Sequence, residues 1–130
     1  MGAWSHTSFG NDDASDFIYE VEEDGAPAVA NAFEVVNHLS ADDYLEAPDA
    51  SVALAAAELV AAAGGQPPAN FPEQAAAVVS RISNHRALRG DALSAVKRVL
   101  KNSELRELWS EAEDFDKWRA EVEGLIERLK

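Results

Sequence analysis

The chain has 130 residues, no cysteine and a net charge of −13, and 47% of its residues are hydrophobic. The lack of cysteine excludes a disulfide framework and a thiolate metal site, and the hydrophobic content argues against general disorder. This length suits one domain, so we expect residues 1–130 to form a single helical domain.

The first predicted element is an irregular N-terminal arm over residues 1–10. Trp4 and Phe9 lie in it without helical spacing, and we expect these two aromatic side chains to anchor the arm to the rest of the protein. Asn11 stands in the position of an N-cap, because the first apolar helical stripe begins directly after it. This first helix is expected to end near Gly25, since glycine commonly terminates helices.

Two further helices are predicted in the middle of the chain. Residues 27–39 carry an apolar stripe with spacings of three and four, which is typical of an amphipathic helix. The connector that follows is expected to contain a short helical turn around Tyr44 and Leu45. Residues 49–63 are rich in alanine, which favours helix and allows close approach of neighbours. We therefore place this third helix at the centre of the fold.

A loop rich in glycine and proline, residues 64–71, divides the chain. No segment alternates with period two, so the sequence predicts an all-α bundle of about six to seven helices. Trp109 and Trp118 have helical spacing with aliphatic residues and are expected in the core. The expected boundaries after the loop are Pro72 for the fourth helix, an Arg89-Gly90-Asp91 break before the fifth, Asn102 or Ser103 as cap of the sixth, and Asp114 for the last.

Charge is distributed unevenly along the chain. Residues 1–80 contain 14 acidic residues and no Lys or Arg, whereas residues 81–130 contain all 11 basic residues and 10 acidic ones. The basic stretch 81–101, interrupted at Gly90, resembles helix-turn-helix spacing, but the overall charge of −13 repels nucleic acid and anionic lipid. We therefore expect a cationic protein partner, and neither a nucleic acid nor a membrane.

The acidic residues most exposed to a partner are expected at helix ends and in the connector. A competing interpretation assigns this acidity to solubility alone, with the basic stretch partly neutralised by the acidic half. The partner-binding candidates are Glu22, Glu23, Asp24, Asp42, Asp43 and Glu46.

Catalytic motifs with recognisable local spacing are absent from the sequence. An acidic cluster near the N-terminus consists of His6, Asp12, Asp13 and Asp16. Its carboxylates share a helix face and are the candidates for a metal site. An EF-hand does not fit, because Asp16 occupies the position of the required glycine. Helix capping and a solvated acidic face account for these residues, so we expect no metal and no cofactor.

The N-terminal run Met1-Gly2-Ala3-Trp4, Phe9 and the segment 11–17 resemble the opening of the bacterial domain of unknown function family 4259. Segments 44–58 and 102–109 are also similar to that family. The chain departs from the family pattern at Ser5, where glycine is usual, and at Phe17, where tryptophan is usual. The resemblance implies a domain definition without catalytic residues. It directs attention to the motif residues Trp4, Phe9, Asn11, Asp12, Asp16 and Glu58.

Two main hypotheses for function remain open, beside a third class, a structural or oligomerisation protein. The first is a non-enzymatic, cytoplasmic protein-interaction module, for example an immunity or antitoxin-like protein that covers a basic surface. The second is a metal-dependent enzyme or ligand-binding protein that uses the N-terminal acidic cluster. The absence of a catalytic motif and the charge of residues 1–80 favour the first.

Overall fold

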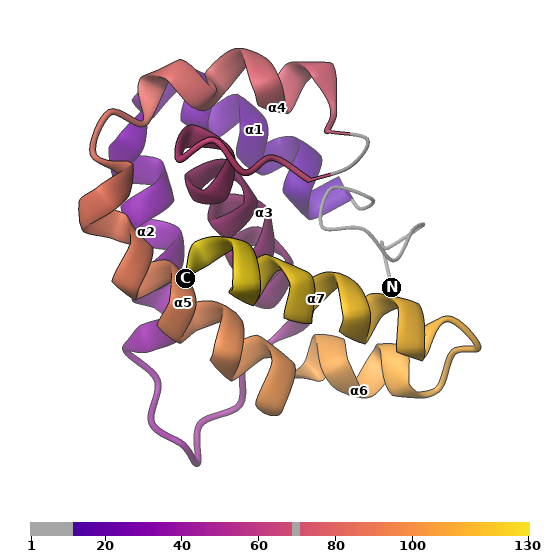
Figure 1. Cartoon of the computed structure of the whole chain (residues 1–130). Coiled ribbons are helices and arrows are strands. Elements are labelled where there is room, and N and C mark those ends of the chain that lie inside the picture. Colours follow the sequence, from indigo (N-terminus) through magenta and orange to yellow (C-terminus); the bar gives the residue numbers. More distant parts are fainter. Residues whose placement is uncertain (1–11, 69–70) are drawn as a thin grey trace.

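The structure is a computed structural model that describes residues 12–68 and 71–130. Within these ranges the protein is all-α, as the sequence predicts, with seven α-helices, one 3-10 helix and no strand (Figure 1). The predicted N-terminal arm, with Trp4, Phe9 and the Asn11 cap, lies outside the described residues. The helices are α1 (Asp12–Asp24), α2 (Ala26–Asn37), α3 (Ala47–Ala63), α4 (Glu73–Val78), η1 (Val79–Arg81), α5 (His85–Lys101), α6 (Glu104–Ser110) and α7 (Phe115–Leu129).

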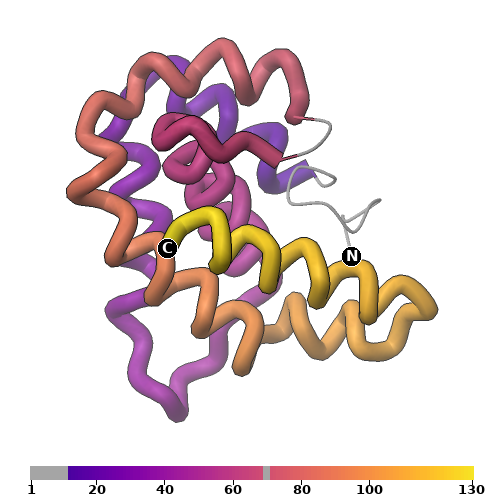
Figure 2. The backbone as a smooth tube through the Cα atoms, in the orientation of Figure 1, coloured from indigo at the N-terminus to yellow at the C-terminus, as the bar shows by residue number. Residues whose placement is uncertain are grey.

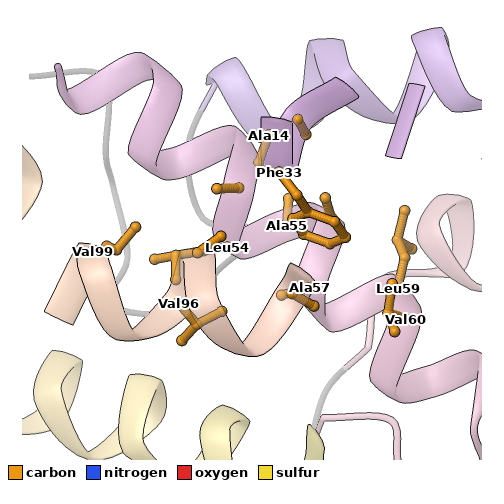
Figure 3. Packing of buried hydrophobic residues seen from close by; sticks show 14 of the residues in the cluster. Ala14, Phe33, Leu54, Ala55, Ala57, Leu59, Val60, Val96 and Val99 are labelled. Atoms are coloured by element: carbon orange, nitrogen blue, oxygen red, sulfur yellow. The ribbon is translucent and has the colours of Figure 1, made fainter. Parts of the chain in front are cut away.

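Helix α3 is the centre of the fold and contacts each of the other six α-helices. Twelve of its 17 residues are buried, and most of these are alanines. A helix that is apolar on all sides belongs in the interior, and its small side chains let the surrounding helices approach closely. Figure 3 shows Leu54 of α3 in the same part of the core as Val96 and Val99 of α5. The predicted central position of this helix is therefore confirmed.

The remaining helices cover α3 on several sides. Helices α2 and α5 contact each other as well as α3, and α7 contacts both α3 and α5 (Figure 1). The predicted core positions Trp109 and Trp118 are buried. The Ser103 hydroxyl oxygen accepts a hydrogen bond from the backbone N–H of Arg106 at 3.0 Å. Ser103, one of the two predicted residues, is therefore the N-cap of α6.

The predicted break at Arg89-Gly90-Asp91 is wrong, because α5 runs through it without interruption. Glycine inside a helix costs only about 1 kcal/mol relative to alanine. A continuous buried stripe that includes Leu88, Ala92 and Val96 offsets that cost by packing against α3. The helix-turn-helix interpretation of this basic stretch is therefore also wrong.

The helical turn expected around Tyr44 and Leu45 is also wrong. The connector between α2 and α3 forms a turn at residues 41–42 and then runs without helix to the start of α3; it projects from one end of the molecule (Figure 2). Leu45 is buried, and its carbonyl oxygen accepts a hydrogen bond from the backbone N–H of Glu104 at 2.9 Å. The Glu104 carboxylate in turn accepts from the N–H of Ala47 at 2.8 Å. This pairing with α6 replaces the local hydrogen bonds of a helical turn.

Candidate functional site

All six predicted partner-binding carboxylates are exposed, but they form two separate groups. Glu22, Glu23 and Asp24 lie in the last turn of α1, directly before α2. The other three, Asp42, Asp43 and Glu46, lie in the connector directly after α2 (Figure 2). The 12 residues of α2 separate the two groups by about 18 Å.

A groove of about 210 Å³ lies between α1, α2 and the first turns of α3. It lies along the middle of α2, between the two acidic groups, and its lining combines apolar side chains with exposed polar ones. Glu20 and Asp49, both exposed, contribute carboxylates, and Asn31 contributes an amide. Phe17, Ala28, Ala32, Val35 and Val52 supply the apolar lining.

Glu20 and Asp49 connect the groove to the two predicted acidic groups. Glu20 stands one helical turn before Glu23 and Asp24, so the three carboxylates share one side of α1. Asp49 stands three residues after Glu46 at the start of α3. The result is an acidic strip, which we define as the groove together with Glu23, Asp24 and Glu46. Glu20 and Asp49 are not distinguished in the sequence from the other acidic residues, because only the packing of α1 and α3 against α2 brings them to one groove.

Arg81 and Arg98 of the basic half contact the acidic half through backbone oxygens rather than carboxylates. Arg81 donates from Nη1 to the carbonyl oxygen of Glu22 at 2.6 Å. Arg98 donates from Nη1 to the carbonyl oxygen of Ser40 at 2.9 Å and from Nη2 to that of Asp43. In the described part of the chain, none of the predicted partner-binding carboxylates forms an ion pair with Lys or Arg. Their negative charge therefore remains available to solvent and to a partner.

Asp43 differs from the other candidates because its side chain holds the connector. Its Oδ2 accepts a hydrogen bond from the backbone N–H of Ser40 at 2.8 Å. Hydrogen bonding to Ser40, followed by the charges of Arg98 and His38, lowers the pKa of Asp43 below its ordinary value. A lowered pKa means that this carboxylate stabilises the connector above its ordinary titration range, and that the stabilisation is lost as pH falls through the lowered value.

The predicted metal candidates fall only partly within the described residues. Asp12 and Asp16 are exposed on α1 and Asp13 is half-buried beside them, whereas His6 lies outside. Among residues 12–68 and 71–130, no three His, Asp or Glu side chains are grouped so that they could hold a metal ion. In the same part of the chain, no helix is both long enough and apolar enough to cross a bilayer.

Glu58, which the sequence motif singled out, is buried in the middle of the fold. Its carboxylate lies 2.7 Å from Nη1 of Arg128 on α7, and the Glu58 side chain is 2% exposed. Arg128 also donates to the carbonyl oxygen of Gln66 at 3.1 Å. This ion pair joins the central helix to the last helix and to the loop after α3, which is a structural role.

The two histidines on the described chain occupy different surroundings. His38 follows α2 directly and is exposed. His85 begins α5 and is half-buried beside Gly64 and Arg128, in a second cavity.

Comparison with known proteins agrees with the resemblance seen in the sequence. The family described as Domain of unknown function (DUF4259) matches residues 2–121, which include α1 through α6 and the first part of α7. No curated protein and no solved structure matches the chain. Because the match covers most of the chain, the protein belongs to the family Domain of unknown function (DUF4259).

Proposed function

We propose that this protein is a non-enzymatic interaction module that binds a cationic segment of a partner protein along the acidic strip. An immunity or antitoxin-like protein that covers a basic surface is one concrete form of this function. The observation that carries the proposal is that exposed Glu20 and Asp49 line the same groove, with no Lys or Arg of the described chain in an ion pair with either.

The groove has the chemistry that a lysine or arginine side chain requires. The aliphatic stem of such a side chain packs on apolar surface while its charged head remains near water. Val35 and Val52 supply apolar surface in the groove, and the carboxylates of Glu20 and Asp49 accept charge-assisted hydrogen bonds. Further carboxylates on either side attract neighbouring basic residues of the same segment and speed its association.

Neutralising the two groove carboxylates is expected to weaken binding of a cationic peptide. A short, fluorescently labelled arginine-rich peptide serves as the probe, and fluorescence anisotropy measures its Kd. Each exposed ion pair contributes up to about 1 kcal/mol, so Glu20→Gln with Asp49→Asn should raise Kd about three- to tenfold. The matched control is Glu111→Gln with Glu113→Gln, which removes the same charge from exposed positions outside the groove.

The control variant shows whether the peptide is bound by the groove or attracted by the net charge of the protein. Weakening by the groove variant and not by the control supports the proposal. Equal weakening by both variants means that the peptide responds to the total charge of −13 alone, and the groove assignment then fails.

Charge reversal in the connector is expected to act on association rate. Asp42 and Glu46 are suitable positions, whereas reversal of Asp43 would disturb its hydrogen bond with Ser40. Asp42→Lys with Glu46→Lys should slow stopped-flow capture of the same peptide several-fold at low salt and less at high salt, because charges at the edge of an interface act mainly by steering. An on-rate that is unchanged by these reversals and by salt would assign the acidity to solubility instead.

A further inference from the structure

A second cavity lies at the other end of α3 and has the opposite charge. It has a volume of about 520 Å³ and is bounded by the end of α3 with the loop after it, the first turn of α5 and the last turn of α7. Figure 1 shows the last turn of α7 beside the first half of α5. Its basic lining residues are His85, Arg86, Arg89, Arg128 and Lys130.

Two of these cations have no carboxylate partner among residues 12–68 and 71–130. Arg86 and Arg89 are exposed and stand three residues apart on α5, so their guanidinium groups share one side of the helix. In the portion of the chain that the structure describes, neither forms an ion pair. Lys130, by contrast, lies 3.5 Å from Glu127, and Arg128 is held by Glu58.

The cavity is also partly pre-organised. Arg128 is held by the Glu58 carboxylate at 2.7 Å and by the Gln66 carbonyl at 3.1 Å. Ligand binding therefore costs little conformational entropy at this side chain, because it is already ordered. The start of α5 adds a positive dipole end, and no side chain caps it. Four cationic side chains and one acidic side chain, Glu127, line the space.

We propose that this cavity, which we call the basic pocket, binds a small molecule that carries a phosphate or pyrophosphate group. Guanidinium groups match phosphate oxygens with paired hydrogen bonds, and several converging cations suit a multiply charged anion better than a single carboxylate. The volume of about 520 Å³ is within the range of small-molecule sites. The proposal uses none of the residues of the acidic strip and is independent of the function proposed above.

The charge of the whole protein selects a small anion over a nucleic acid. An extended polyanion at the basic pocket would also approach a surface that carries a net charge of −13. A small phosphate compound fits within about one Debye length, roughly 8–10 Å, and therefore experiences mainly the local positive charge.

Isothermal titration calorimetry with inorganic pyrophosphate tests the proposal on the full chain. We expect saturable binding with one site per chain, and a Kd at least tenfold weaker in Arg86→Gln with Arg89→Gln. The matched control is Lys97→Gln with Lys101→Gln, which removes the same charge from exposed positions further along α5 and should stay within twofold of the parent. Circular dichroism and thermal melting verify that each variant is folded.

A second variant tests the space rather than the charge. Gly64 has an ordinary φ of −83°, and a Cβ built there would lie 3.7 Å from Nδ1 of His85, so a larger side chain is compatible with the backbone and enters the pocket lining. Gly64→Leu should therefore also weaken pyrophosphate binding. Absence of saturable binding, or equal weakening by the α5 control pair, would overturn the proposal. Citrate binding as tightly as pyrophosphate would overturn the phosphate assignment.

Discussion

Replacement of Arg128 by methionine is expected to lower the free energy of unfolding by about 3 kcal/mol, measured by urea denaturation. The Glu58 side chain is 2% exposed, so this variant removes the cation that lies 2.7 Å from a buried carboxylate. We expect the low end of the range for a broken buried pair, because the Arg128 side chain is 21% exposed and water reaches it.

The double variant Glu58→Leu with Arg128→Met separates the two contributions to this cost. Apolar groups of similar volume often replace a buried ion pair without loss of stability, so the double variant should be more stable than Arg128→Met alone. The free energy of unfolding of Arg128→Met could instead lie within about 0.5 kcal/mol of the parent value, which is roughly the scatter among neutral surface substitutions. The ion pair would then contribute no more than a surface salt bridge, and burial of Glu58 would not require Arg128.

Trp118→Ala is expected to cost about 3–5 kcal/mol of unfolding free energy. Trp118 is 2% exposed on α7, and its ring stacks on that of Phe115 with centroids 6.1 Å apart. Truncation therefore removes a large apolar area from the core and leaves a cavity that its helical neighbours fill only partly. In a protein of this size the loss corresponds to a decrease in Tm of about 10 °C or more.

Tyr19→Ala is the matched control for this variant. Tyr19 is an aromatic residue on α1 that is 63% exposed, and surface substitutions of this kind usually change stability by about 0.5 kcal/mol or less. If Trp118→Ala and Tyr19→Ala had the same Tm, α7 would not be packed against the core as described.

Local sequence signals were sufficient to predict features that depend on one helix alone. The apolar stripes predicted the helices, Gly25 marked the end of α1, and Ser103 capped α6. The alanine content of residues 49–63 indicated the central helix, because small side chains let neighbouring helices approach closely.

The errors arose where distant segments compete with local preference. Gly90 suggested a break, but packing of Leu88, Ala92 and Val96 against α3 continues the helix through it. Leu45 suggested a helical turn, but its carbonyl oxygen accepts a hydrogen bond from the backbone N–H of Glu104 instead of a local one. Neither interaction can be predicted from the residues next to Gly90 or Leu45 in the sequence.

The sequence by itself determined the helical class, the separation of charge between residues 1–80 and 81–130, and the family to which the chain belongs. The tertiary structure alone decided which charges meet. Glu20 and Asp49 are 29 positions apart and line one groove, and Arg86 and Arg128 are 42 positions apart and line one pocket. The physical reason is that helical periodicity fixes which side of each helix is buried, whereas the choice of neighbouring helices depends on the packing of the whole core.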